Sequence, residues 1–354
     1  MPRIRRTARR SKAETRRHNI REIAAAANVS VATVSRTLQT PDVVAPETRE
    51  RVRKTIARFG YTPNLQARIL RTARTQLVVA LVPDISNPFF AEVIRGIEKV
   101  AHEHGYSVLL GDTQHSKLRE QKYADLLGTR QADGLITLLP HIPKITLPPP
   151  LPIVNACEYV KDRQITSVHV DNVAAARVAT EYLLDLGHER IGFVTGPMKS
   201  PISIDRDRGY QEALQGAGIA RDPALTANGD FSFESGMAAG ERLLDANRWM
   251  TAVFCSNDEM AIGVIRAARG RGLQVPRDLS VVGFDDIHLA RHYDPPLTTI
   301  AQPMGDLGSE AMSRLIEILN GTAGRPRKQV LPTQLVVRSS TLSPVSTRLL
   351  RRAQ

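Results

Sequence analysis

Polar side chains that follow apolar runs in the later part of the sequence are the first candidates for chemistry. Asp112, Asn257 and Asp285 each come at the end of such a run, and Phe89 and Phe90 are adjacent aromatics. Carboxylates and amides exchange hydrogen bonds with hydroxyl groups, and a phenyl ring stacks on another ring. Singly, each has a structural alternative, since such an Asp often caps a helix and such a Phe often belongs to the core. Together they predict a small-molecule site.

A second candidate set lies near the N-terminus and has the chemistry to contact DNA. Arg36 can grip a guanine through two parallel hydrogen bonds, and Thr33 or Ser35 can hold phosphate oxygens. The predicted DNA-reading positions of this segment are Ser30, Val31, Ala32, Thr33, Ser35 and Arg36. The alternative is an ordinary pair of short helices, which many proteins contain.

Two predicted helices position this set. Apolar residues recur at helical spacing over 20–27, after Asn19 as a good N-cap. A turn of three residues then ends at Ser30, which can cap a second helix from Val31. So short a turn forces the helices to cross steeply, and the pattern therefore predicts a helix-turn-helix.

The same pattern predicts the core of this small unit. Val29, Val34 and Leu38 are expected to fill the seam between the first two helices. A third helix is predicted over 46–59 and ends at Gly60, completing a three-helix core.

The distribution of charge favours a nucleic-acid partner. The chain has 354 residues and a formal net charge of +12. Residues 1–75 hold 18 Lys and Arg against 5 Asp and Glu, whereas the remaining residues hold 30 against 31. A short cationic segment on a nearly neutral body is typical of a phosphate-binding protein. For residues 1–17 alone, a solvated basic tail is an equal alternative.

From Leu77 onward, apolar runs alternate with amphipathic segments, which indicates βαβ units and parallel sheets. Strands are predicted to start at Leu77, Tyr106, Gly134, Pro152, Arg190, Ala252 and Leu279. They are too many for one compact sheet, and a second series begins after Asp171. Two similar lobes with a ligand cleft at the carboxyl ends of their strands are therefore predicted.

A further short helix can start at Pro63 and run from Asn64 to Leu70, with too little apolar surface to be stable alone. It would fold only against something else. The predicted division is a basic disordered tail over 1–18, a helix-turn-helix headpiece over 19–63, a hinge helix and linker over 64–75, a two-lobed domain over 76–341 and a C-terminal tail over 342–354.

Several protein classes are disfavoured. No apolar run reaches the roughly 18 residues of a membrane span, and the arginine-rich N-terminus does not resemble a signal peptide, so we expect a cytoplasmic protein. Cys157 and Cys255 are expected to be buried free thiols. Because no glycine-rich phosphate loop, clustered metal ligands or nucleophile elbow is present, we expect neither catalysis nor a metal or other cofactor.

Several segments of the chain form a recognisable series. They are VSVATVSRTL from Val29, ETRERV from Glu47, GYTPN from Gly60, VPDISNPFFAEVIRGIE from Val82, VDN from Val170, LGHERIGFVTGP from Leu186, GDFSFESG from Gly229, ND from Asn257, VPRDLSVVGFDD from Val275 and PPLTTIAQP from Pro295. Their order and spacing between Asn19 and Thr341 resemble the lactose-repressor (LacI) family of bacterial transcription regulators.

The resemblance implies a sequence-specific repressor that binds double-stranded operator DNA as a homodimer or homotetramer under the control of a small-molecule effector. It implies an α+β multidomain fold: a three-helix headpiece, a hinge helix and a two-lobed α/β sensor of the periplasmic-binding-protein (type I) kind. Asn64, Ala67 and Leu70 of the hinge would contact DNA, with Leu70 as a wedge in the minor groove.

The resemblance also implies an effector pocket. With Asp112 from the strand-end argument, the expected residues are Phe89, Phe90, Asp112, Glu158, Arg206, Phe231, Asn257, Asp285 and Gln302. Arg206 is expected in a loop before a helix. Cys157 stands where the family commonly has Asp or Asn, and Glu158 is expected to substitute for it.

Four further segments resemble a nucleoside-responsive member of the family. They are LLGDTQH from Leu109, residues 155–158, SVHVDN from Ser167 and DPPLTTIAQP from Asp294. The phenylalanines could sandwich a base while Asp285 and Arg206 hold ribose hydroxyls, although a sugar or sugar acid would use the same polar pair. A solute-binding receptor is the remote alternative, because it shares the two-lobed fold.

Overall fold

The structure is a computed structural model that describes residues 18–62, 74–148, 151–158 and 165–344. Contacts between residues divide the chain into two compact units, 1–74 and 75–354. We call the described part of the first unit the headpiece and that of the second the sensor. The predicted hinge helix and most of both predicted tails lie outside the described residues.

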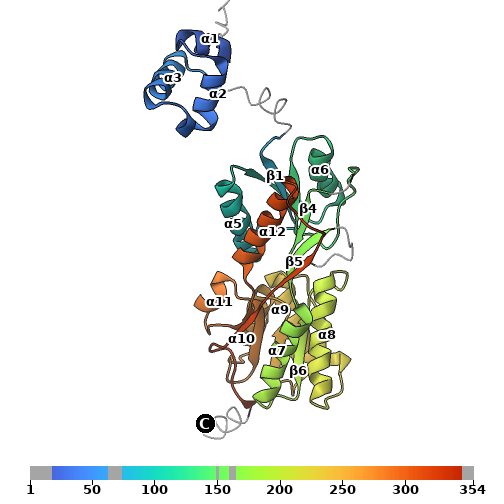
Figure 1. The fold of residues 1–354 in the computed structure, drawn as a ribbon. Helices are drawn as coiled ribbons and strands as arrows, with labels where there is room; N and C mark the ends of the chain where they lie inside the picture. The colour runs from blue at the N-terminus through green and yellow to red at the C-terminus, as the bar shows by residue number, and fades with distance from the viewer. Residues whose placement is uncertain (1–17, 63–73, 149–150, 159–164, 345–354) are drawn as a thin grey trace, which may run out of the picture. The chain divides into compact units, whose positions relative to one another are not determined.

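The headpiece contains three α-helices and a short 3-10 turn (Figure 1). The elements are α1 (Ile20–Ala26), α2 (Val31–Gln39), η1 (Pro41–Val43) and α3 (Pro46–Phe59). Asn19 and Ser30 cap α1 and α2 with their side chains, and Gly60 ends α3 in the left-handed conformation. Ile23 and Val52 are fully buried in the shared core. The predicted helix-turn-helix is confirmed.

The seam between α1 and α2 differs from the prediction at one position. Val34 is fully buried and Val29 packs on the same core, but Leu38 is 38% exposed. Thr37 is buried instead, and its hydroxyl donates a hydrogen bond to the Thr33 carbonyl at 2.9 Å. A hydroxyl that is paired within its own helix can be buried at little cost. The prediction for Leu38 was wrong because apolar spacing takes no account of such a bond.

The sensor contains two lobes. The first lobe consists of β1 (Leu77–Val82), α5 (Pro88–Glu103), β2 (Ser107–Asp112), α6 (Lys117–Gly128), β3 (Gly134–Thr137), β4 (Ile153–Ala156), β5 (Thr166–Val170), α12 (Met304–Leu319) and β11 (Lys328–Leu331). The second lobe consists of α7 (Asn172–Asp185), β6 (Ile191–Thr195), α8 (Pro201–Gly216), η2 (Pro223–Leu225), β7 (Thr226–Asn228), α9 (Phe233–Ala246), β8 (Ala252–Cys255), α10 (Asp258–Gly270), β9 (Ser280–Asp285), α11 (His288–His292), β10 (Thr298–Ala301) and β12 (Gln334–Val336).

Each lobe is built on a six-stranded sheet, which confirms the two-lobed prediction (Figure 1). The strand order is β11-β5-β4-β3-β1-β2 in the first lobe and β12-β10-β9-β8-β6-β7 in the second. Neighbouring strands are parallel except for the pair β10 and β12. Because parallel strands end at the same edge, residues that follow them in sequence gather in space.

Both faces of the first sheet are buried, as β1 illustrates. Val78, Ala80 and Val82 join the core that lies under α5 and α12, whereas Val79 and Leu81 join the core on the side of α6. Successive side chains of a strand point to opposite faces, so a sheet covered on both sides requires an apolar residue at every position. This requirement is why the sequence analysis recognised the run from Leu77.

The chain passes between the lobes three times, after β5, after β10 and after β11. The last two crossings were not predicted: α12 packs against α5, and β11 pairs with β5, although both follow the second lobe in sequence. Five strands lie outside the seven predicted ones, namely β5, β7, β10, β11 and β12. In β5 and β10 the buried positions include Thr166, Ser167, Thr298 and Thr299, so these strands are not apolar runs.

Candidate functional site

The predicted DNA-reading residues of the headpiece lie on α2. Ser30 fixes the start of this helix, because its Oγ accepts a hydrogen bond from the Thr33 backbone N–H at 3.1 Å and lies 2.9 Å from Thr33 Oγ1. Val31 is 40% exposed, and Ala32 and Arg36 are exposed as well. The first two turns of α2 therefore present a row of small residues and one guanidinium to solvent.

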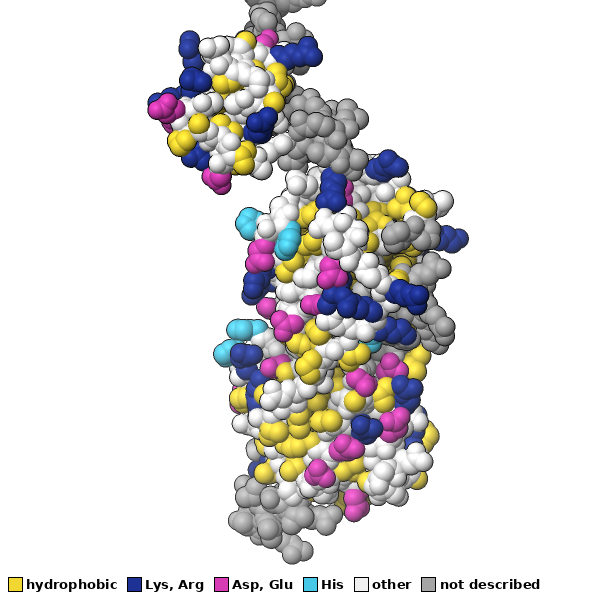
Figure 2. Space-filling model, viewed as in Figure 1, with side chains coloured by type: hydrophobic (Ala, Val, Ile, Leu, Met, Phe, Trp, Pro, Cys, Tyr) yellow, Lys and Arg dark blue, Asp and Glu magenta, His cyan; other side chains and the backbone are white. Residues whose placement is uncertain are grey.

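Arg36 is available to a base edge. Its guanidinium makes no ion pair or hydrogen bond within the described residues, and Ser35 lies half-buried beside it. Lys and Arg side chains surround the headpiece on the face shown in Figure 2. Asn64, Ala67 and Leu70 lie outside the described residues.

Arg206 lies in α8 rather than in the predicted loop before a helix, and it is 3% exposed. Its Nε donates to Asn172 Oδ1 at 2.9 Å, and its Nη1 donates to the Ser256 carbonyl. Its guanidinium carbon lies 3.7 Å from the centre of the Phe284 ring. The predicted placement in a loop was wrong, because the sequence does not mark the buried face of α8. Arg206 instead ties α8 to α7 and to the ends of β8 and β9.

Two buried carboxyls from different lobes lie near Arg206. Asp285 ends β9 in the second lobe and is 5% exposed, while Glu158 follows β4 in the first lobe and is 7% exposed. Burial raises the pKa of each to about 7, against the attraction of Arg206. Gln302 Nε2 donates to Asp285 Oδ1 at 2.7 Å, and the Ser200 hydroxyl donates to Glu158 Oε1 at 3.2 Å. We use the name interlobe cluster for these five residues, which are Glu158, Ser200, Arg206, Asp285 and Gln302.

A third carboxyl, Asp258, is fully buried near Asp285 and has a structural role. Its Oδ1 accepts a hydrogen bond from the Thr299 hydroxyl at 2.6 Å, and its Oδ2 accepts one from the Ile287 N–H at 2.9 Å. Burial, followed by repulsion from Asp285, raises its pKa well above the usual range. A Cβ atom at Gly283 would lie 2.1 Å from Asp258 Oδ1, so this position requires glycine.

Phe231 and Asn257 are joined by a hydrogen bond, from Asn257 Nδ2 to the Phe231 carbonyl at 2.9 Å. Asn257 Oδ1 also accepts from the Met260 N–H at 3.0 Å and so caps α10. Phe231 has a φ of 73°, which is rare for a residue with a Cβ. A Cβ atom at Gly196 would lie 2.2 Å from Phe231 Cζ, so the ring rests directly on this glycine. These contacts hold the ring in one place.

The remaining first-lobe candidates follow β1 and β2. Phe89 is 8% exposed and belongs to the core, as its structural alternative proposed, and Phe90 is half-buried with its ring centre 5.3 Å from that of Phe89. Asp112 Oδ2 accepts from Gln114 Nε2 at 3.0 Å. No hydrogen bond or ion pair recorded for the described residues joins Phe89, Phe90 or Asp112 to Arg206.

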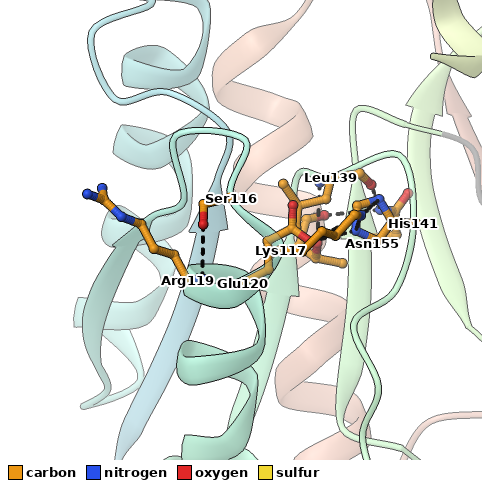
Figure 3. A network of polar contacts seen from close by, with 8 residues as sticks. Ser116, Lys117, Arg119, Glu120, Leu139, His141 and Asn155 are labelled. Atoms are coloured by element: carbon orange, nitrogen blue, oxygen red, sulfur yellow. Dashed lines mark hydrogen bonds and ion pairs between the residues drawn. The ribbon is translucent and has the colours of Figure 1, made fainter. Parts of the chain in front are cut away.

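A polar network that the sequence did not suggest supports the first-lobe strand ends (Figure 3). Asn155 Nδ2 donates to the Leu139 carbonyl at 3.0 Å and so ties β4 to the segment after β3. The buried Glu120 carboxylate lies 2.8 Å from His141 Nε2 and 3.2 Å from Lys117 Nζ. Because Glu120 and His141 are 21 residues apart in sequence, no local motif indicates this network. The Asn155 bond fixes the end of β4, the strand that Glu158 follows.

Some buried polar atoms at the strand ends and at the start of α8 have no partner among the described residues. Four of the eight such side-chain atoms among the described residues are Asn155 Oδ1, Glu158 Oε2, Ser203 Oγ and Ser256 Oγ. They belong to the end of β4, the start of α8 and the end of β8. Buried polar groups are nearly always paired in proteins, so this arrangement suits a molecule that supplies hydrogen bonds. Asn155, Ser203 and Ser256 were missed as site residues because no local pattern shows that their polar atoms are buried without a partner.

Two family models match the chain. "Bacterial regulatory proteins, lacI family" matches residues 19–64, and "Periplasmic binding protein-like domain" matches residues 180–341. No helix in the described part of the chain is long and apolar enough to cross a membrane.

Relatives match almost the full length. The HTH-type transcriptional repressor CytR of Escherichia coli (strain K12) is 42% identical over 329 residues, which cover 91% of this chain and 96% of that protein. Catabolite control protein A of Priestia megaterium is 37% identical over 328 residues, which cover 91% and 98%.

The solved structure of the Lac repressor dimer bound to operator and the anti-inducer ONPF matches with a TM-score of 0.80 and 28% identity, covering 92% of this chain and all of that one. The transcriptional regulator CelR–cellobiose complex matches with a TM-score of 0.69 and 32% identity, covering 92% and 100%. With the helix-turn-helix and the two-lobed sensor, these likenesses show that the chain belongs to the lacI family of bacterial regulatory proteins and is a DNA-binding transcription regulator.

Proposed function

We propose that this chain is a cytoplasmic repressor without catalytic activity, and that it binds its operator as a dimer. A small molecule bound at the interlobe cluster changes its affinity for that operator. One observation carries the proposal: a single chain combines a helix with an exposed DNA-reading face and a buried polar cluster in which Glu158 Oε2 has no hydrogen-bond partner. We also propose the domain division given by the sequence, with a headpiece over 19–63, a hinge over 64–75 and a sensor over 76–341.

The headpiece reads the operator through α2. Arg36 pairs with a guanine in the major groove, while Thr33 and Ser35 hold phosphate oxygens. Support comes from the exposure of Arg36 and from the capped, rigid start of the helix at Ser30. Asn64, Ala67 and Leu70 complete the interface as a hinge helix that folds on the DNA.

The effector is a nucleoside. Phe231, with Phe90 from the first lobe, supplies aromatic surface for a base, while Arg206 and Asp285 hold ribose hydroxyls. Asn257 and Gln302 keep Phe231 and Asp285 in position. The segments that resemble a nucleoside-responsive member of the family support this choice, together with the 42% identity to the repressor CytR. The alternative effector is a sugar. The likeness to the CelR–cellobiose complex favours this alternative, and Arg206 and Asp285 could hold sugar hydroxyls as well as ribose hydroxyls.

Ligand and operator are coupled through lobe closure. The interlobe cluster draws Glu158 from the first lobe and Arg206 from the second, so a ligand held by both changes how the lobes close. The coupling is reciprocal, and such couplings are typically about 1 to 3 kcal/mol.

The proposal is tested by selecting duplexes from a random DNA pool with the full-length chain. The selected sequence is then titrated with and without cytidine, adenosine, ribose and cellobiose. We expect one preferred sequence, bound with an affinity that changes about tenfold when a nucleoside is present. Equal binding to all duplexes under every condition would overturn the proposed function.

A further inference from the structure

A carboxyl from the opposite lobe lies at the N-terminus of α8. Ser200, the N-cap of α8, makes no capping hydrogen bond with its own side chain. Instead, its hydroxyl donates to Glu158 Oε1 at 3.2 Å, and the nearby Ile202 N–H favours the charged form of this carboxyl and so lowers its pKa against the effect of burial. The free N–H groups and the dipole at a helix N-terminus attract anions. In this protein the Glu158 carboxylate already occupies that position.

The second oxygen of the same carboxyl has no protein partner. Glu158 Oε2 is buried without a hydrogen bond, and Glu158 as a whole is 7% exposed. A buried carboxylate oxygen accepts hydrogen bonds and repels a second anion. A ligand beside it must therefore bring a donor, such as a hydroxyl or an amine.

Acidic side chains outnumber basic ones around Arg206. Asp285 and Glu158 are the acids whose charges act most strongly on its guanidinium. A further carboxyl, Asp205, acts on Glu158 from the first turns of α8. An anionic ligand would enter a region in which the one guanidinium is already shared among several carboxyls.

The acidic character extends to the facing loops of the two lobes. Burial, followed by repulsion from Asp84 and Glu234, raises the pKa of Glu259. Asp84 follows β1 in the first lobe, whereas Glu259 lies in the first turn of α10 in the second. The first lobe thus adds a negative charge opposite a helix N-terminus of the second.

We propose that the interlobe cluster accepts only effectors that carry no negative charge, and that Glu158 enforces this rule by occupying the α8 N-terminus and offering Oε2 to a ligand hydroxyl or amine. The proposal rests on the cluster being the effector site proposed above. It selects a free nucleoside over a nucleotide, and a neutral sugar over a sugar acid or sugar phosphate.

The first test uses inorganic phosphate and needs no knowledge of the effector. Thermal unfolding of the full-length protein is followed at pH 8 with phosphate or with chloride at equal ionic strength. Glu158→Gln keeps the shape of the side chain and frees the helix N-terminus from its carboxylate. At about 10 mM phosphate we expect its unfolding midpoint to rise by about 2 °C, with no rise for wild type or for Glu212→Gln, an exposed control on α8. An equal response of all three proteins would overturn the proposal.

The second test compares cytidine with cytidine 5′-monophosphate by calorimetry. We expect wild type to bind the nucleoside at least about 100-fold more tightly, and Glu158→Gln to narrow this ratio about tenfold. Equal affinities for the two compounds in wild type would overturn the proposed exclusion of negatively charged effectors and leave the nucleoside assignment intact. If neither compound binds, the nucleoside assignment fails, and the phosphate experiment still tests whether Glu158 excludes negatively charged effectors.

Discussion

The headpiece and the interlobe cluster both hold polar side chains ready for a partner, but they do so in opposite environments. Arg36 is exposed and water satisfies its donors at no cost, whereas Glu158 Oε2 is buried and has no protein partner. The residues of the first set lie within one short helix, while those of the second are brought together from both lobes. The DNA-reading face can therefore change with little effect on folding, but a change in the cluster affects folding and ligand binding together.

The strongest test of this contrast is Arg206→Ala. It leaves Glu158 and Asp285 buried without their cation, and breaking a buried charge network costs about 3 to 5 kcal/mol of unfolding free energy. Urea unfolding of the full-length protein measures the loss. The matched control is Arg177→Ala, an exposed arginine of α7, for which we expect less than about 0.5 kcal/mol. Similar values for both variants would contradict the buried network.

The second test is the pH dependence of stability in Glu158→Gln. Burial raises the pKa of Glu158 to about 7 from its ordinary value of 4.5, so the folded protein binds its proton more tightly than the unfolded chain does. This contribution to stability is fully present below about pH 4.5 and is lost as pH rises through 7. Between pH 5 and 8 we expect wild type to lose about 2.5 kcal/mol relative to Glu158→Gln.

The measurement is chemical unfolding of both proteins at each pH, and their difference removes the titration of all other groups. Glu212→Gln serves as the control and should show no such difference, because this carboxyl is exposed. Parallel curves for wild type and Glu158→Gln would mean that the carboxyl is not held in the environment described.

The third test concerns the headpiece alone. Arg36→Ala should weaken binding to the selected operator by about 1 to 3 kcal/mol and leave the unfolding free energy within about 0.5 kcal/mol of wild type. Fluorescence anisotropy with operator and with random duplex measures the effect. An equal loss on both duplexes would assign Arg36 to phosphate rather than to a base.

The smallest expected effect checks the corrected seam of the helix-turn-helix. Ser30→Ala removes the cap of α2 and should cost about 1 kcal/mol of headpiece stability. Leu38→Ser changes an exposed side chain and should cost less than about 0.5 kcal/mol. Thermal unfolding followed by circular dichroism compares the two variants. A larger loss of stability for Leu38→Ser than for Ser30→Ala would mean that Leu38 is buried between α1 and α2 as first predicted.

The same contrast explains what the sequence could predict. Asn19, Ser30 and Gly60 mark the helix ends of the headpiece through local rules, and β1 shows the unbroken apolar run of a sheet buried on both faces. These features depend on neighbouring residues only. The family resemblance then supplied Arg206, which no local pattern marks.

Long-range contacts set the limit of prediction. Arg206 is buried because Asn172 and the Ser256 carbonyl, each at least 34 residues away, accept its hydrogen bonds. β5 and β10 escaped detection because their buried threonines and serines are satisfied by partners elsewhere in the fold, such as the pair formed by Thr299 and Asp258. Glu158 was singled out only as a substitute for a family residue, and its contact with Ser200 at the start of α8 depends on how the two lobes come together.

The interleaved order of the two lobes has a consequence for synthesis. The edge of β5 is covered by β11, which leaves the ribosome only after all of the second lobe except β12 has been made. At bacterial elongation rates of about 5 to 20 residues per second, the nascent first lobe waits roughly 8 to 30 s with an open sheet edge. During that interval the open edge of the first lobe can be bound by chaperones. A chain that ends before Lys328 would have an unfinished first lobe.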